Sequence, residues 1–179
     1  MLWRLFWLFI VLLSGCRLSG PVTPTATPDP VTRLERQAAE ALARDDRETE
    51  ALALRDALER LPSGDHTRLA ELRGRCVEAM VEAGGHASSL ALWSELAQKN
   101  PEQKEQAEKM VKRARQLVLQ QGRELLEQVV LDEKAGHRQS ALCSALASVE
   151  LLKRAGAEPD ELAKAEGLAT RLSQELQAK

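Results

Sequence analysis

The chain has 179 residues, with 25 Lys or Arg and 27 Asp or Glu, so its formal net charge is −2 at pH 7. This length suits one domain or two at most, and the balanced charge excludes the strongly basic character of most nucleic-acid-binding proteins. Four of the five aromatic residues lie within the first nine positions. Because bases and sugar rings are held on aromatic faces, we expect no nucleic-acid partner and no small-molecule substrate.

The N-terminus begins with a strongly apolar segment. Nine consecutive apolar residues run from Leu5 to Leu13, preceded by a single charge at Arg4. A transmembrane helix needs roughly 20 apolar residues, whereas the apolar region of a secretory signal has about 7–15. Residues 1–15 are therefore predicted to be a signal peptide. The alternative, a buried N-terminal helix, would need a large core around it.

The four residues Leu13-Ser14-Gly15-Cys16 directly follow this run. They resemble the lipobox of bacterial lipoproteins, in which an aliphatic residue and two small residues precede a cysteine. The resemblance implies that Cys16 carries a covalent lipid and becomes the mature N-terminus. No other cofactor and no metal is expected. Several acyl chains anchor a protein stably, so the membrane is an expected partner. An ordinary secretory signal or an uncleaved anchor is the alternative.

The residue after Cys16 is Arg17. In the sorting rule of lipoproteins from bacteria with two membranes, Asp at this position favours the inner membrane. The resemblance therefore implies the periplasmic face of the outer membrane, or the outer face of the cell membrane in an organism with one membrane.

Residues 16–30 combine the lipidated cysteine with a tether rich in Pro and Thr. Four of the seven prolines lie in this segment. Such a composition cannot pack a core and favours extended geometry. At about 3.1 Å per residue the tether could hold the following domain up to roughly 40 Å from the bilayer.

Residues 31–179 are predicted to form one α-helical domain. They are rich in Ala, Leu, Glu, Arg and Gln, which favour helices, and no stretch alternates with the period of a strand. Breaks at Gly, Pro and Asx positions divide the segment into about seven amphipathic helices. We expect antiparallel helical hairpins, stacked as a solenoid or an irregular bundle. The predicted helix starts are Thr32 with Glu35, Asp45 with Glu48, and Asn100 with Pro101.

One 34-residue segment, 70–103, resembles a tetratricopeptide repeat. Ala79 falls at the small position where the two helices of a repeat touch, and Gly84 falls at the turn. Trp93 takes the bulky position of the second helix, and Pro101 the closing position. The departures from the repeat are Val77, Ser89 and Leu96. Segments 31–64 and 122–155 fit the same pattern more weakly, so a generic stack of hairpins is the alternative.

The stretch 101–135 is predicted to be one helix of about 50 Å, with Gly122 as the point where it would bend or break. Its positive cluster, Lys109 to Arg115, is a docking patch for an acidic partner or lipid headgroups in one interpretation. In the favoured interpretation it is a solvated helix face. The apolar stripe of this stretch consists of Ala107, Met110, Ala114, Leu117, Val118, Gln121, Leu125 and Val129.

The sequence contains no recognisable catalytic motif, so the protein is not expected to be an enzyme. Cys76 and Cys143 are isolated and are interpreted as small core residues. Two alternatives need the fold to bring distant residues together. One is a metal site that adds His86 and His137. The other is a disulfide, which needs the two Cα atoms within about 7 Å.

In a tetratricopeptide arrangement the first helix of each hairpin lines a concave groove. For the segment 70–103 the resemblance places five residues in it, predicted to bind a partner: Glu71, Gly74, Glu78, Val81 and Glu82. Such a groove would be acidic and would suit a basic or extended peptide.

These patterns together predict a membrane-anchored, extracytoplasmic lipoprotein that binds another envelope protein. It would be an adaptor or a pilotin-like assembly factor for a secretion, pilus or motility system. The alternative is a self-associating structural envelope lipoprotein with no peptide-binding groove.

Overall fold

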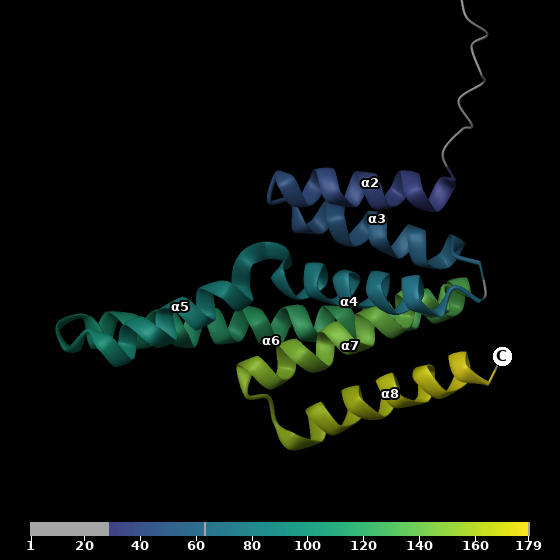
Figure 1. Ribbon diagram of the computed structural model, residues 1–179. Coiled ribbons are helices and arrows are strands. Elements are labelled where there is room, and N and C mark those ends of the chain that lie inside the picture. The colour runs from purple at the N-terminus through teal and green to yellow at the C-terminus, as the bar shows by residue number, and fades with distance from the viewer. Residues whose placement is uncertain (1–28, 63, 179) are drawn as a thin grey trace, which may run out of the picture.

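The computed structural model describes residues 29–62 and 64–178, and within them it contains helices and no strand. The predicted all-α class is confirmed for this part of the chain. The predicted signal peptide, Cys16 and most of the predicted tether lie outside the described residues. The helices are α2 (Pro30–Ala43), α3 (Arg47–Arg60), α4 (His66–Glu82), α5 (His86–Lys99), α6 (Lys104–Ala135), α7 (Arg138–Ala155) and α8 (Pro159–Gln177), with short 3-10 turns η1 (Ala83–Gly85) and η2 (Pro101–Gln103) (Figure 1).

Three helices begin at residues other than those predicted. Helix α6 begins at Lys104, after the turn η2, and the Asn100 side chain forms no capping hydrogen bond. The side chain of Asp29 caps α2 by accepting a hydrogen bond from the Thr32 N–H at 3.3 Å, so Thr32 lies inside the helix. In α3 the cap is Asp46, which accepts from the Thr49 N–H at 3.0 Å. Asp45 instead adopts a left-handed conformation with φ 58° in the preceding turn. Aspartate tolerates that conformation better than most residues, and this leaves its neighbour to cap the helix.

Consecutive helices pack against one another in antiparallel pairs, with one exception (Figure 1). After Gly84 and Gly85, which have φ of 72° and 64°, α5 continues away from α4 and packs along α6. The helical hairpin predicted for residues 70–103 is therefore wrong. Ala79 is buried in the main core, while Trp93 lies on α5. The two glycines redirect the chain without reversing it, so α5 packs on α6 and not on α4.

Helix α6 is continuous over 32 residues, or about 48 Å, as predicted. Gly122 lies within it without a break and sits against α7. A Cβ atom there would come within 3.1 Å of Cδ2 of Leu152, and the Ser148 hydroxyl donates a 2.7 Å hydrogen bond to the Gly122 carbonyl. The glycine therefore serves the close approach of α6 and α7 and does not end the helix.

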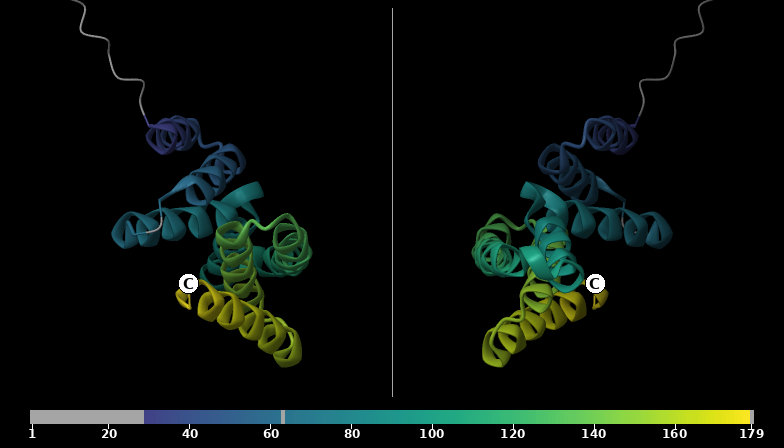
Figure 2. Two further views of the ribbon diagram at one scale, coloured as in Figure 1. Left: turned by 90° about the vertical axis from the view of Figure 1, so that its right-hand side faces the viewer. Right: turned by 90° about the vertical axis from the view of Figure 1, so that its left-hand side faces the viewer.

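Helix α7 lies at the centre of the molecule and contacts α3, α4, α6 and α8. The main core runs from α2 to α7, and a smaller one joins α6, α7 and α8. The helices stack from α2 at one end to α8 at the other (Figures 1 and 2). The arm, which we define as α5 with the first half of α6, projects from this body. Among residues 29–62 and 64–178, no helix has the length and apolarity needed to cross a bilayer.

Candidate functional site

A hollow of about 590 Å³ lies between α4 and α7, and we call it the α4–α7 groove. Four of the five residues predicted to bind a partner line it, and the exception is Glu71, which is exposed elsewhere on α4. The α4 side of the groove consists of Ala70, Arg73, Gly74, Val77, Glu78, Val81 and Glu82, and the α7 side of Leu146, Val149, Glu150 and Arg154.

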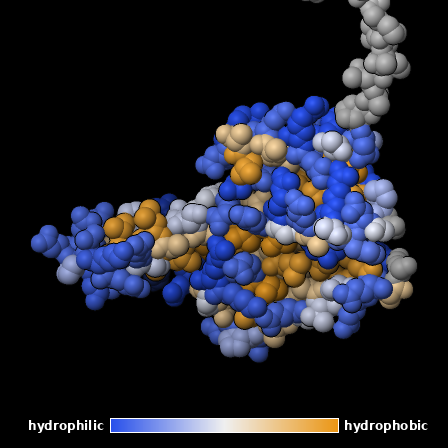
Figure 3. All heavy atoms as spheres, in the orientation of Figure 1, coloured by the Kyte–Doolittle hydropathy of each residue, from blue (hydrophilic) through white to orange (hydrophobic). Residues whose placement is uncertain are grey.

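The floor of this groove is apolar. It is formed by Val77 and Val81 from α4 and by Leu146 and Val149 from α7. On the surface, apolar side chains form a band on this face between α4 and α8 (Figure 3). The sequence predicted an acidic groove. In the structure the carboxylates of Glu78, Glu82 and Glu150 line the groove together with apolar side chains, which form its floor. The α7 residues were missed because the repeat pattern paired α4 with α5.

Arg73 stands in the groove with an unsatisfied donor. Its Nη2 donates a 2.8 Å hydrogen bond to Oε1 of Gln139 on α7. Its Nε is buried and has no hydrogen-bond partner among the described residues. A buried N–H without an acceptor costs free energy, and such groups are rare in folded proteins. Because the Nε is buried, an incoming group cannot reach it directly, but Arg73 lines the groove and forms no ion pair among the described residues.

At its other end the groove is bounded by an ion-pair cluster. Arg154 is 3.1 Å from Oε1 of Glu82 and 2.9 Å from Oε1 of Glu150. The hydrogen bond to Glu150, followed by the one to Glu82, raises the pKa of Arg154. Ser88 also donates a hydrogen bond to Glu82. The Glu82 carboxylate is thus already paired, whereas Glu78 forms no ion pair among the described residues.

Long-range hydrogen bonds position the two helices that form the groove. Gln121 of α6 donates to the carbonyl oxygens of Met80 at 2.9 Å and Ala83 at 3.0 Å, which caps the end of α4. The carboxylate of Glu59 on α3 accepts a 2.7 Å hydrogen bond from the N–H of Ser140 in the first turn of α7. Gln121 is the one polar residue in the predicted apolar stripe of α6. Its polarity at that position was the only sign in the sequence that this side chain caps another helix.

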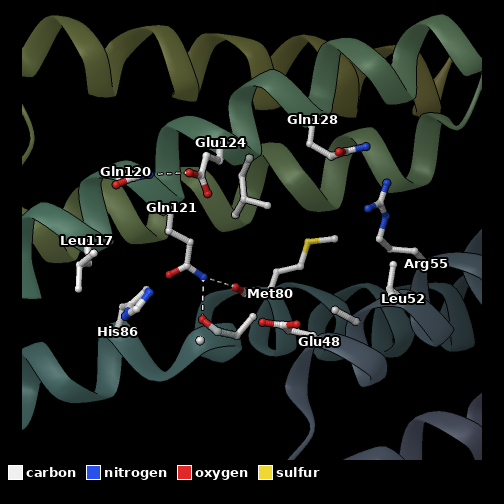
Figure 4. A pocket seen from close by; sticks show the side chains of 14 residues that line it. Glu48, Leu52, Arg55, Met80, His86, Leu117, Gln120, Gln121, Glu124 and Gln128 are labelled. Atoms are coloured by element: carbon white, nitrogen blue, oxygen red, sulfur yellow. Dashed lines mark hydrogen bonds between the residues drawn. The ribbon is translucent and has the colours of Figure 1, made fainter.

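A second hollow, of about 480 Å³, lies between α3 and α6. Leu52 and Leu117 line it, and Met80 contributes from α4 (Figure 4). The Nε2 of Gln120 donates a 2.8 Å hydrogen bond to Glu124 in the same hollow. The Oε1 of Gln121 is buried here and has no hydrogen-bond partner in the part of the chain that the structure describes. This hollow is lined by a larger share of polar side chains than the α4–α7 groove.

A buried ion pair joins three helices of the body. Arg55 of α3 lies 2.5 Å from Oδ1 of Asp132 on α6, and Asp132 is 3% exposed. Gln128 donates to the same carboxylate at 2.9 Å, and the Ser144 hydroxyl on α7 does so at 3.3 Å. The carboxylate is thus engaged by groups from α3, α6 and α7, and it fixes their relative positions.

The structure brings together two of the four residues considered for a composite site. Cys76 on α4 and Cys143 on α7 are both buried and carry free thiols. The neighbouring Cys76 thiol, together with burial, raises the pKa of Cys143 well above its usual value. His86 begins α5 and His137 precedes α7, and within the described residues no three His, Cys, Asp or Glu side chains gather as metal ligands would.

Comparison with protein families, with curated proteins and with solved structures finds no match to this chain.

Proposed function

We propose that this protein is a lipid-anchored, extracytoplasmic lipoprotein whose helical body binds another protein of the cell envelope. The observation that supports binding is the α4–α7 groove, which combines an apolar floor with Arg73 and Glu78, two charged residues that form no ion pair among the described residues. Exposed apolar hollows with a polar rim are typical of protein-binding sites. The proposal includes no reaction, no metal and no cofactor other than the lipid.

The anchoring part of the proposal rests on residues 1–30 of the sequence. The apolar run, the lipobox-like Leu13 to Cys16 and the Pro-rich tether have the order found in bacterial lipoproteins. We place the protein on the periplasmic face of the outer membrane, or on the outer face of the cell membrane where there is one membrane. There it would act as an adaptor or pilotin-like assembly factor for a secretion, pilus or motility system.

We describe the body as an irregular stack of helices with a repeat-like beginning, α2 to α4. A regular tetratricopeptide array is not proposed, because α4 and α5 diverge. The groove therefore lies between α4 and α7, which are far apart in the sequence, and not inside a series of repeats.

The anchoring is tested by changing Cys16→Ser and fractionating the cells. We expect the native protein to stay with the membrane after high-salt washing and the variant to be released with an unprocessed or differently processed N-terminus. Identical partitioning and identical N-terminal masses of the two proteins would contradict the proposal.

Binding is tested by affinity capture from detergent-solubilised membranes with two matched variants. Val77→Asp places a charge on the apolar floor of the α4–α7 groove, and Leu52→Asp places one in the second hollow. We expect the first variant to lose the captured protein and the second to keep it. The alternative function, self-association, predicts instead a concentration-dependent oligomer in sedimentation and capture of the same chain only.

A further inference from the structure

We propose that the α4–α7 groove receives a single amphipathic helix of the partner, which places a carboxylate on Arg73 and a cation beside Glu78. This inference rests on the proposed protein-binding function and adds the kind of segment that is bound. It also fixes the orientation of that segment, because the two charged contacts differ in sign.

The shape of the groove favours a helix. The described residues contain no strand, so there is no sheet edge to which an extended peptide could add. The α4 residues that line the groove recur at three- and four-residue intervals from Ala70 to Glu82. Twelve residues of helix rise about 18 Å, which is the length of three helical turns. A helix with apolar residues at three- and four-residue spacing matches such a groove.

The floor requires apolar side chains from the partner. Val77, Leu146 and Val149 are only half-buried. Val77 also packs against the main core, and the other two pack against the smaller core. A helix that covers these three residues removes their remaining apolar surface from water. This burial would supply the non-directional part of the affinity.

The charges set the direction of the partner helix. Arg73 lines the groove and forms no ion pair among the described residues, so a carboxylate of the partner would make a charge-assisted hydrogen bond to its guanidinium. Glu78 lies five residues further along α4, or about 7.5 Å, with no cation paired to it among the described residues. Since Glu82 is already paired with Arg154, the groove has one unpaired charge of each sign. The partner helix should therefore carry an acidic and a basic residue four or five positions apart.

The test is photo-crosslinking in native membranes with the full-length protein. A benzophenone amino acid is placed at Val77, at Leu146 or, as a control outside the groove, at Leu52. We expect both groove positions to crosslink to one polypeptide, and the control position not to. Mass spectrometry of the adduct should map to a segment with apolar residues at three- and four-residue spacing. Adducts with lipid, with a second copy of this chain or with a segment lacking that pattern would overturn the inference, as would the absence of groove adducts.

The charged contacts are tested in the same assay. Arg73→Glu and Glu78→Lys should each reduce the adduct at Val77 at least fivefold, while Glu71→Lys, outside the groove, should leave it unchanged. Replacing the mapped acidic residue of the partner by Lys should restore the adduct of the Arg73→Glu variant. Equal crosslinking by all variants would overturn the orientation. Circular dichroism of each variant checks that the helices are retained.

The two proposals fail in distinguishable ways. If the Cys16→Ser variant partitions as the native protein does and has the same N-terminal mass apart from the substitution, the anchoring is wrong, whatever the crosslinks show. If the native protein is anchored and captures a partner that does not crosslink at Val77 or Leu146, the function stands and the helix-in-groove inference is overturned.

Discussion

Helices α7 and α5 are both short amphipathic helices, yet they sit in very different surroundings. Helix α7 contacts four other helices and buries eleven of its 18 residues, whereas α5 packs mainly on α6 and buries two of its 14. The difference lies in the number of neighbours, which the sequence of either helix alone does not reveal. We therefore expect the body around α7 to unfold as one cooperative unit and the arm to open more easily.

The largest expected difference is between a core leucine and an arm leucine. Leu151 on α7 is fully buried, while Leu92 on α5 is 56% exposed. Leu151→Ala should lower the free energy of unfolding by about 3–4 kcal/mol, because it removes buried methyl groups and leaves a cavity. Leu92→Ala should change it by less than about 0.5 kcal/mol. Urea titrations followed by circular dichroism measure both values, and equal losses would contradict the comparison.

The second comparison concerns ion pairs. Asp132→Ala removes the carboxylate that receives Arg55, Gln128 and Ser144 inside the body. Because Arg55 retains some exposure, we expect a loss of about 2–3 kcal/mol, below the range for fully buried pairs.

The matched control is Glu105→Ala on the arm, whose pair with Lys109 is highly exposed. Exposed pairs within one helix contribute about 0.3–0.5 kcal/mol. If Glu105→Ala lowered the free energy of unfolding as much as Asp132→Ala does, the burial of an ion pair would not explain a difference in stability between the arm and the body.

The arm also carries its own spectroscopic probe. In a chain that begins at residue 29, Trp93 is the single tryptophan. Its fluorescence reports on the arm, while circular dichroism at 222 nm reports mostly on the body. We expect the fluorescence transition to come at a lower urea concentration, corresponding to about 1–2 kcal/mol less stability. Coincident transitions would show that the arm and the body unfold together.

The helices of the body could be predicted because each amphipathic period is local. The all-α class and the turn at Gly84 followed from residues close in sequence, whereas the bend or break considered at Gly122 does not occur. The pairing of helices could not be predicted in the same way. A turn with two glycines of positive φ leaves the direction of the next helix open, and the contacts of α6 decided it.

The candidate site was predicted on one of its two sides. Four of the predicted α4 residues line the groove. They were chosen at three- and four-residue intervals, and residues at such intervals lie on one face of a helix whichever helix packs beside it. The α7 side and the apolar floor depend on contacts between residues far apart in the sequence, such as Arg73 and Gln139, which are 66 positions apart. No local pattern encodes a contact of that kind. The assignment of a partner to this groove stays a prediction.

The smallest expected effect is the loss of stability when one surface ion pair is removed. We compare the pair between α6 and α8, Arg123 with Glu161, with a pair within α6, Lys109 with Glu105. The hydrogen bond from Arg123 of α6 at 2.6 Å lowers the pKa of Glu161 on α8 below its ordinary value of 4.5. A carboxyl whose pKa is lowered by folding stabilises the folded state above its unfolded pKa. That stabilisation is lost as the pH falls through the lowered, folded value.

Glu161→Gln should therefore reduce the Tm by no more than about 2 °C at pH 7, since the pair is solvent-screened. The difference between variant and native protein should persist down to about pH 5. It should shrink as the pH falls from 4.5, where the carboxyl of the unfolded chain takes up its proton, through the lowered pKa of the folded state. Calorimetry over this pH range measures the difference. Glu105→Gln, whose partner lies on the same exposed helix, should show a smaller difference throughout. The comparison would be contradicted if the difference in Tm from the native protein were equally large for both variants at every pH. The ion pair between α6 and α8 would then stabilise the protein no more than an exposed pair within the arm does.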